Sequence, residues 1–439
     1  MTRYLIIGAG AAGISAAEAI RSLDIHSDIL LVCEEADGYY SRPGLAYLLS
    51  GEIPEEQLFP FQERDYQRLK LHRIHAHVKN ILPQEHMVEL NNGKLISYDR
   101  LLIATGAKAA QMKAPGLELQ GVVKLDNVND ARHILKFGRR GKTAVIVGGG
   151  ITALELVEGL RARGVKVHYF LRGDRYWSNV LDETESRIVE HRLIEESVRL
   201  HYNTELSEVL GKRDRVVGVR TTEGKITKCD LVGIAIGVIA RKELVENCGV
   251  KVDRGILVDE HMRSSIPDIY AAGDVAQVFD PTLGKSVLDS LWGPARLQGY
   301  TAGLNMAGQS AVYIKGVPFN VTRLAGLTTT IIGTVGGRGE DSDTIGIVRG
   351  DSETWRQLPD AIATQSHFDV NRLRVLVGEK HIVGAIVMGD QTLSLPIHQL
   401  AIQKVDITSI REQLLHPRQP IHATLTDYWT KVAPTLRRQ

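Results

Sequence analysis

Apolar residues alternate along this 439-residue chain between short β-branched runs and longer stretches rich in Ala and Leu. The first run, residues 4–7, leads through a glycine-rich turn into a helical stretch and then into a second apolar run at 28–33. Residues 143–170 repeat the same order. Strand, turn, helix and strand form a βαβ unit, so the pattern predicts two Rossmann-like α/β domains.

Two further buried strands indicate how these units are connected. Residues 98–104 and 269–272 are apolar runs, and each stops at a turn marked by glycine. They lie on either side of the second unit, which predicts that this unit is inserted into the first domain. The expected limits are 1–114 and 241–317 for the first domain, 115–240 for the inserted domain and 318–439 for a third domain.

The third domain has a different pattern. Alternating stretches at 372–377 and 381–387 are separated by turn residues, and helical periodicity follows from Leu393 to Leu415. This mix predicts a small α+β domain with an antiparallel sheet. The domain carries no motif that indicates chemistry. Its expected roles are a homodimer interface, a cover for a cofactor or a docking surface.

Composition and charge exclude several classes of protein. Hydrophobic residues make up 43% and charged residues 24%, as in ordinary globular proteins. Lys and Arg number 53 against 52 Asp and Glu, so no overall field favours nucleic acid or an anionic membrane. The longest apolar run, Leu231 to Ala240, is too short to span a bilayer and predicts one buried strand. The chain starts directly with a strand, without a signal peptide pattern, which predicts a cytosolic protein.

Three cysteines, Cys33, Cys229 and Cys248, are scattered along the chain. They form no C-x-x-C pair and no cluster with His at metal-ligand spacing, so we expect no disulfide framework and no metal site. Each is expected to act as a small buried hydrophobic residue.

The first glycine-rich turn has the spacing of a dinucleotide-binding site. Gly8 permits a tight bend, Gly10 lets the backbone approach a pyrophosphate, and Gly13 allows close packing of helix on strand. The N-terminus of the following helix then faces the phosphates. Glu34 stands at the end of the next strand and is the candidate ribose acid, with Glu35 in reserve.

The second turn repeats this spacing at Gly148 and Gly150, with Ala153 where a third glycine would stand. No acid ends its second strand, which is followed by Leu171 and Arg172. A carboxylate would repel a 2′-phosphate whereas Arg can bind one, so the pattern favours NADPH over NADH. A solvated loop residue is the alternative interpretation of Arg172. Two different nucleotide sites in one chain imply hydride transfer between them, for which flavin is the natural acceptor.

Together these segments resemble the two-dinucleotide-binding-domain flavoproteins, the pyridine nucleotide-disulfide oxidoreductase superfamily, over about the first three hundred residues. The resemblance implies FAD on the first domain and NADPH or NADH on the inserted one. Its most specific elements are residues 104–106, which in the family link the two domains beside FAD, and Gly273-Asp274. The Asp of the latter pair binds the ribityl and pyrophosphate region of FAD in the family.

Within the superfamily, residues 39–45 resemble the Y-x-R-P segment of rubredoxin, putidaredoxin and nitrite reductase-type flavoproteins and of apoptosis-inducing factor. The resemblance places Arg42 near the flavin and Glu155 near the nicotinamide, which makes both catalytic candidates. The helix starting at Trp292 is similar to one that meets the flavin pyrimidine edge. The expected cofactor-binding residues are Gly8, Gly10, Ala12, Gly13, Glu34, Glu35, Arg42, Val78, Ala104, Thr105, Gly106, Gly148, Gly150, Thr152, Ala153, Glu155, Arg172, Gly237, Gly273, Asp274, Trp292 and Ala295.

Two departures from the family pattern restrict the reaction. Disulfide reductases carry C-x-x-x-x-C, and peroxide-forming or disulfide-cleaving relatives carry one Cys in the segment occupied here by residues 41–43, but this chain has neither. Several Y-x-R-P relatives also place a Lys where Tyr47 stands, paired with the Glu matched by Glu155. The flavin environment is therefore expected to be less cationic here.

The two nucleotide sites, the missing thiols and the Y-x-R-P segment predict an FAD-dependent NAD(P)H oxidoreductase. The leading hypothesis is electron transfer from reduced FAD, one electron at a time, to a small iron-sulfur carrier of the ferredoxin or rubredoxin type. A second hypothesis is an NAD(P)H oxidase or a nitrite reductase-like flavin subunit. A third, of another class, is a redox-sensing scaffold similar to apoptosis-inducing factor.

Overall fold

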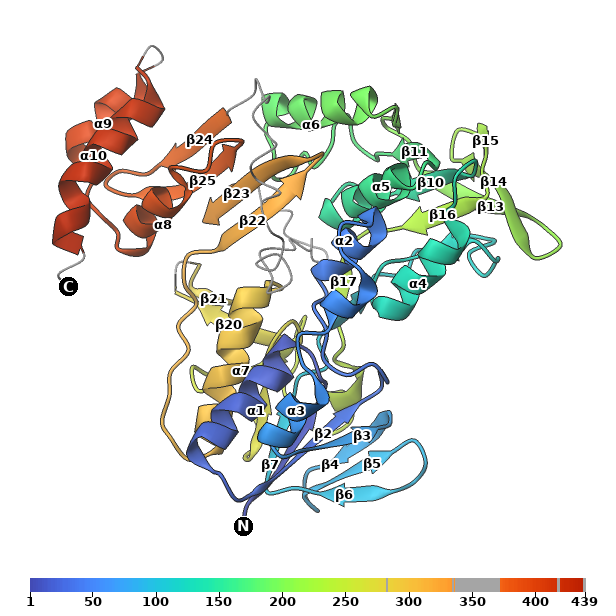
Figure 1. The fold of residues 1–439 in the computed structure, drawn as a ribbon. Helices are drawn as coiled ribbons and strands as arrows, with labels where there is room; N and C mark the ends of the chain where they lie inside the picture. Colours follow the sequence, from blue (N-terminus) through green and yellow to red (C-terminus); the bar gives the residue numbers. More distant parts are fainter. Residues whose placement is uncertain (282, 334, 336–371, 417–418, 437–439) are drawn as a thin grey trace.

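The computed structural model describes residues 1–281, 283–333, 335, 372–416 and 419–436. Its elements fall into three groups, two built around parallel sheets and one around an antiparallel sheet (Figure 1). This arrangement confirms the α/β class predicted from the two βαβ patterns and the α+β character predicted for the third domain.

The first group contains β1 (Arg3–Ile7), α1 (Ala11–Leu23), β2 (Asp28–Cys33), α2 (Gly44–Ser50), the 3₁₀ helix η1 (Glu55–Leu58), α3 (Glu63–Arg68), β3 (Leu71–His75), β4 (Val78–Leu82), β5 (Met87–Leu90), β6 (Leu95–Ser97), β7 (Arg100–Ile103), β19 (Ile269–Ala271) and α7 (Trp292–Met306). Its parallel sheet has the order β19-β7-β1-β2-β3. Leu5 and Ile6 of β1 point to opposite faces and both are fully buried, because a parallel sheet is covered on both sides.

Two helices of this group, α1 and α7, lie side by side (Figure 1). A side chain at Gly299 would collide with the carbonyl oxygen of Ala12, and one at Gly303 with that of Ala16. Glycine at these two positions therefore lets the helix backbones touch. This contact holds the N-terminal turn of α1 next to the chain that enters α7.

The second group contains β9 (Val122–Val123), α4 (Val128–Phe137), β10 (Thr143–Val147), α5 (Ile151–Ala162), β11 (Lys166–Phe170), α6 (Glu183–Glu195), β12 (Arg199–His201), β13 (Leu206–Lys212), β14 (Arg215–Thr221), β15 (Ile226–Lys228) and β16 (Leu231–Ile234). The parallel sheet has the order β12-β11-β10-β16-β9, and β13-β14-β15 form an antiparallel sheet. Apolar residues of both sheets, such as Val145 and Val219, share one core.

One predicted strand is two. Residues 231–240 form β16 and β17 (Val238–Ala240), because the chain turns at Gly237 with a φ of +109°, which an L side chain rarely adopts. The turn lets β17 pair antiparallel with β8 (Ala107–Ala109), so both connections between the parallel sheets run through this two-stranded ladder. The domain limits at 114/115, 240/241 and 317/318 stay predictions, because pairing shows where the chain crosses and not where a unit ends.

The chain then forms the 3₁₀ helix η2 (Glu243–Val245) and a small sheet of β18 (Ile256–Leu257), β20 (Ala276–Asp280) and β21 (Lys285–Leu288). The third group consists of β22 (Phe319–Leu324), β23 (Leu327–Gly333), β24 (Arg372–Val377), β25 (Ile382–Met388), α8 (Ser394–Ile402), α9 (Thr408–Leu415) and α10 (Ile421–Leu436). Its antiparallel sheet has the order β22-β23-β25-β24. The helical stretch predicted from Leu393 to Leu415 is two helices.

The hairpin of β22 and β23 links the third group to the rest of the protein. It lies between the C-terminal helices and the region of α2, α5 and α6 (Figure 1). Leu324 and Leu327 belong to the same buried core as Leu49 of α2 and Leu156 of α5. Among the helices described, none has both the length and the apolar character needed to cross a membrane, and the cytosolic location stays a prediction.

Candidate functional site

The first glycine turn connects β1 to α1 and is shaped as a cradle. Gly8 has a φ of +113°, and a side chain there would collide with the carbonyl oxygen of Ala104. A side chain at Gly13 would collide with the carbonyl oxygen of Gly8, so the helix lies directly against the turn. At Gly10, the residue that caps α1, a Cβ would meet nothing within 4 Å. The turn is thus tight on its inner side and open in front of the helix N-terminus, where a pyrophosphate would bind.

Segments far apart in sequence converge on this cradle. Gly273, with a φ of +79°, lies against the first turn of α1, because a Cβ there would be 3.1 Å from that of Ala12 and 3.8 Å from that of Ala295. Its N–H donates a 2.9 Å hydrogen bond to the side chain of buried Gln298. The half-buried Asp274 follows, and Trp292 begins α7 nearby. The structure thus brings together the predicted residues 8–13, 104, 273–274 and 292–295.

Two buried hydroxyls, one before Arg42 and one before α7, fit a cofactor. The hydroxyl oxygens of Ser41 and Ser290 are buried, and neither has a hydrogen-bond partner among the residues described. Ser41 precedes Arg42, and Ser290 lies two residues before α7. A buried hydroxyl without a partner costs free energy. The polar edge of a flavin, together with its phosphates in the glycine cradle, is a suitable partner for both.

The two candidate ribose acids after β2 are in different environments. Glu35 accepts a 2.5 Å hydrogen bond from the Tyr40 hydroxyl and forms an ion pair with Arg42. Glu34 is more exposed, with its carboxylate 3.5 Å from Nδ1 of His77 and 4.0 Å from Arg241. Glu35 is held by two short contacts and is the less exposed acid, whereas the contacts of Glu34 are longer, so Glu34 is the better placed acid for a ribose. Val78 is the first residue of β4 and follows His77, which contacts Glu34.

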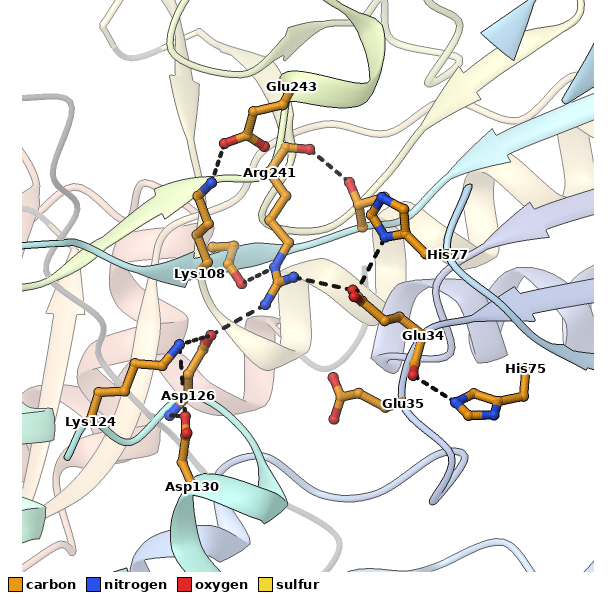
Figure 2. Close-up of polar contacts among 12 residues, drawn as sticks. Glu34, Glu35, His75, His77, Lys108, Lys124, Asp126, Asp130, Arg241 and Glu243 are labelled. Atoms are coloured by element: carbon orange, nitrogen blue, oxygen red, sulfur yellow. Dashed lines mark hydrogen bonds and ion pairs between the residues drawn. The ribbon is translucent and has the colours of Figure 1, made fainter. Parts of the chain in front are cut away.

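Arg241, which sequence reasoning missed, lies where the two nucleotide-binding units meet. Figure 2 shows its guanidinium between Glu34 of the first unit and Asp126 of the second, 3.2 Å from Oδ2 of Asp126. Its backbone N–H donates to Gly106, and its carbonyl accepts from the Thr105 hydroxyl at 3.0 Å. The predicted linker residues Thr105 and Gly106 thus hold the returning chain beside the site.

Arg42 is anchored at the same junction. Its guanidinium donates a 2.5 Å hydrogen bond to the carbonyl of Asp126 and lies 5.3 Å from the centre of the Tyr40 ring. The Asp126 side chain is only 7% exposed, and Lys124 lies 3.5 Å away, so its charge is balanced by cations. Asp126 belongs to the inserted unit, whereas Arg42 and Tyr40 belong to the first. Asp126 therefore connects the two units, through its backbone carbonyl to Arg42 and through its carboxylate to Arg241.

The second glycine turn repeats the geometry of the first with a looser base. Gly148 has a φ of +144°, and a side chain there would collide with the carbonyl oxygen of Ala235. Gly150 caps α5 and is open in front, whereas Ala153 is fully buried behind the turn. Half-buried Thr152 lies in the first turn of α5. Gly237 bends the chain on the neighbouring strand end, so these residues share one edge of the sheet.

The end of β11 carries no acid next to the strand. Leu171 is buried, Arg172 is exposed, and Asp174 is paired with Arg175 at 3.1 Å. Among the basic side chains here, Arg172 is the one the structure leaves at the surface. It is available to a 2′-phosphate and equally to solvent.

Glu155 faces a narrow cleft between α2 and α5. The cleft has a volume of about 40 Å³ and is lined by Pro43, Ala46, Tyr47, Ser50, Glu155, Glu158, Gly159, Thr322 and Arg323. Gly159 allows the close approach of the helices, since a Cβ there would be 2.7 Å from that of Leu49. Tyr47 lies on the α2 side, and two lining residues come from β22. Sequence reasoning missed Glu158 and Arg323, although Glu158 shares a helix face with Glu155 through its i+3 spacing.

The three cysteines are free thiols placed away from this cleft. Burial raises the pKa of Cys229 to about 12, and burial also raises the pKa of Cys33 and Cys248. Thiols held protonated in this way are poor nucleophiles. In the part of the chain that the structure describes, no three His, Cys, Asp or Glu side chains gather as metal ligands would.

Comparisons with known proteins agree with this geometry. A model of the pyridine nucleotide-disulphide oxidoreductase family matches residues 2–298. The NADH oxidase of Methanocaldococcus jannaschii is 31% identical over 328 residues, which is 71% of each chain. The rubredoxin-NAD(+) reductase of Ectopseudomonas oleovorans is 28% identical over 285 residues, 64% of this chain and 74% of that one.

Two matches extend further. Subunit epsilon of the NADH-dependent phenylglyoxylate dehydrogenase of Aromatoleum evansii is 27% identical over 421 residues, 94% of each chain. The solved covalent complex of putidaredoxin reductase with putidaredoxin has the same fold, with a TM-score of 0.81 and 20% identity over 97% of this chain and 98% of that chain.

The fold and its two cradles define a two-nucleotide oxidoreductase. The chain belongs to the pyridine nucleotide-disulphide oxidoreductase family. It is a flavoprotein that binds FAD and NAD(H) and transfers electrons, as the resemblance in its sequence predicted. The roles of individual site residues stay predictions, and so does the preference for NADPH, since the relatives described above are named for NADH or NAD(+).

Proposed function

We propose that the protein is an NAD(P)H-dependent flavin reductase that passes electrons singly to a small iron-sulfur carrier of the ferredoxin or rubredoxin type. FAD supplies this chemistry when bound, because it accepts a hydride and can release one electron at a time. The observation that carries the proposal is the absence of a thiol at residues 41–43, beside two complete nucleotide cradles. Without that thiol, electrons must leave the flavin for an external acceptor.

The named relatives give independent support. A rubredoxin-NAD(+) reductase is similar over 64% of the chain, and the putidaredoxin reductase complex shares the fold over almost all of it. Within the site, we assign Glu34 to the FAD ribose, Arg42 to the flavin side and Glu155 to the nicotinamide side. NADPH as the donor is part of the proposal and rests on exposed Arg172 without a neighbouring strand-end acid.

A second function has its own observation. The match that covers 94% of the chain is to a subunit of a larger dehydrogenase, which favours a flavin subunit that exchanges electrons with bound metal clusters of a partner subunit. The NADH oxidase relative in turn favours oxygen as acceptor. A scaffold similar to apoptosis-inducing factor remains the prediction from another class.

Measuring anaerobic flavin reduction and then flavin reoxidation separately would distinguish these functions. Purified holoprotein would be mixed with NADH or NADPH while flavin absorbance is recorded, and the reduced protein would then meet ferredoxin, rubredoxin or oxygen. We expect fast bleaching, rapid reoxidation by an iron-sulfur carrier and slow reoxidation by oxygen. Fast reoxidation by oxygen alone would identify an oxidase. Failure with every free carrier, alongside copurification with an iron-sulfur subunit, would identify the flavin subunit of a complex.

A further inference from the structure

The cleft beside Glu155 is completed by the C-terminal domain. Its walls come from α2, α5 and β22, three elements that lie far apart in the sequence. Its volume is only about 40 Å³, so a charge on one wall lies close to the groups on the others.

Arg323 is the cation on the β22 wall. Its guanidinium forms a two-pronged ion pair with Glu52, with Nη1 donating to Oε2 at 2.9 Å and Nη2 donating to Oε1. The same guanidinium lies 5.4 Å from the centre of the Tyr47 ring. Only 25% of the Arg323 side chain is exposed. The side chain is therefore held in one position by an acid that follows α2 and by an aromatic ring within α2.

The same hairpin also contacts the second acid of the cleft. The N–H of Gly326, in the turn between β22 and β23, donates a 2.9 Å hydrogen bond to Oε1 of half-buried Glu158. Burial raises the pKa of Glu158 to about 7, and the nearby charges of Glu155 and Glu52 add to this effect. Arg323 and the Gly326 N–H act in the opposite direction. The other ionisable groups that interact with Glu158 are Tyr47, Tyr169, Tyr176 and Arg192.

The position of Tyr47 explains why this cation matters. The sequence resemblance predicts that Tyr47 stands where relatives carry a Lys paired with the acid matched by Glu155, and it predicted a less cationic site. The structure places the Arg323 guanidinium, supplied by β22, over the Tyr47 ring. A planar guanidinium held by two hydrogen bonds is more firmly fixed than a flexible ammonium. The cation is thus present but arrives from β22.

We propose that Arg323 is a positioning residue for hydride transfer, which stabilises the carboxylates of Glu155 and Glu158 and so makes the reactive cleft dependent on the docked C-terminal domain. The proposal rests on the proposed function only in taking Glu155 as the nicotinamide-side acid. It assigns no new chemical step. Hydride still passes from the nicotinamide to the flavin, while Arg323 sets the charge around them.

The test compares Arg323→Met with Arg323→Lys. Flavin reduction by NADH and NADPH would be followed anaerobically from pH 5.5 to 9, and the dissociation constants of NAD⁺ and NADP⁺ would be measured on oxidised holoprotein over the same range. Removing the cation favours the protonated acid, so Arg323→Met should move the midpoint of both pH profiles upward by about one unit. At pH 7, close to the wild-type midpoint, its reduction rate should fall about fivefold, because the ionised fraction of the acid falls from about one half to about one eleventh. In Arg323→Lys, which keeps the positive charge, both pH midpoints should return close to the wild-type values.

Arg372→Met is the matched control. Arg372 lies on β24 of the same sheet and pairs with Asp182 at the start of α6, 2.6 Å away, which also joins the C-terminal domain to the inserted unit. It does not line the cleft. Its loss should leave both pH midpoints at the wild-type value. An equal shift in Arg372→Met would overturn the proposal, because domain docking alone would then explain the effect.

A third variant keeps the test decisive if Arg323→Met does not fold. Glu158→Gln removes the titrating acid, so the pH dependence between 6 and 8 should disappear from both measurements. A wild-type midpoint in Glu158→Gln would contradict the proposal. None of these measurements needs an iron-sulfur carrier, so they remain informative even if ferredoxin and rubredoxin prove not to be the acceptors.

Discussion

The two glycine cradles use the same turn but differ in everything that surrounds it. In the first, Gly13 lets α1 touch the turn, and α1 is itself locked backbone to backbone against α7. In the second, Ala153 takes the place of the third glycine, and α5 packs on α2 and the β22–β23 hairpin. An acid and paired arginines surround the end of β2, whereas β11 ends in a buried Leu171 and an exposed Arg172.

This difference matches the two tasks of the protein. A flavin must stay bound through many turnovers, which requires a rigid and fully partnered site. A nicotinamide nucleotide must enter and leave in every cycle, so a looser base and an open rim suit it. The shared turn provides phosphate binding, while the surrounding packing decides whether the nucleotide is a resident cofactor or an exchanged substrate.

Substituting the first glycine of each turn should give the largest effects. Both Gly8 and Gly148 have positive φ values, and any side chain there meets a carbonyl oxygen. Gly8→Ala should yield protein without FAD, whereas Gly148→Ala should retain FAD but be reduced by NADH on the order of 100-fold more slowly, since strain of this kind costs about 3 kcal/mol. Flavin absorbance and stopped-flow reduction measure both.

Dithionite is the control for this pair, because it reduces flavin without the nucleotide site. Gly148→Ala and wild-type protein should bleach equally with dithionite. If Gly148→Ala lost FAD as readily as Gly8→Ala, the two cradles would not be functionally distinct.

Removing the ribose acid should have the next largest effect. Glu34→Gln should weaken FAD binding about tenfold, since a hydrogen bond to a charged group is worth ~1.5–3 kcal/mol. Equilibrium titration of apoprotein with FAD would measure it. Glu63→Gln, which breaks an exposed pair with Arg73 in the same unit, should leave FAD affinity unchanged. Normal affinity in Glu34→Gln together with a loss in Glu35→Gln would show that the reserve acid binds the ribose.

The rim of the second cradle should control the choice of donor. Arg172→Gln should raise the KM for NADPH about tenfold and leave that for NADH nearly unchanged, because only NADPH carries the 2′-phosphate. Steady-state assays with a fixed acceptor would compare the two donors. Arg175→Gln is the control, since Arg175 is already paired with Asp174. Equal changes for both donors would mean that Arg172 does not discriminate between them.

The smallest expected effect concerns the stability of the second unit in acid. Burial, followed by the charges of His168, Lys225 and Arg199, lowers the pKa of His201 to about 4. Below pH ~6.5 the unfolded chain binds a proton at His201, whereas the folded chain binds it only near pH 4. The free energy of unfolding is therefore unaffected by His201 above pH ~6.5 and decreases as the pH falls towards 4. The melting temperature should drop modestly between pH 7.5 and 5, and less in His201→Gln. An identical drop in that variant would exclude His201 as the cause.

Much of the fold could be predicted from local pattern. Apolar runs, glycine spacing and helix periodicity identified both βαβ units. Gly8 and Gly148 are required by the backbone conformation of their own turns, which is set within a few residues. Residues 231–240 were predicted as one strand, and the error came from Gly237, whose bend lets β17 pair with β8. The helices of the C-terminal domain were merged for a similar reason, since their packing partners are distant in sequence.

The residues of the candidate site also differ in whether local sequence could identify them. The glycines and Glu34 were proposed from short motifs with a fixed spacing, and Glu155 from the family resemblance; their roles stay predictions. Arg241 and Arg323 were not, because their partners Asp126 and Glu52 lie more than a hundred residues away and no spacing rule connects them.

The sequence alone predicted two nucleotide sites and showed that no Cys stands at residues 41–43, since both depend on residue identity within local segments. Only the tertiary structure showed that the C-terminal domain places a cation over Tyr47 and that Asp126 joins the two units through Arg42 and Arg241. The physical reason is that a charge acts through space. Its neighbours are chosen by how the domains pack, and no local pattern records that choice.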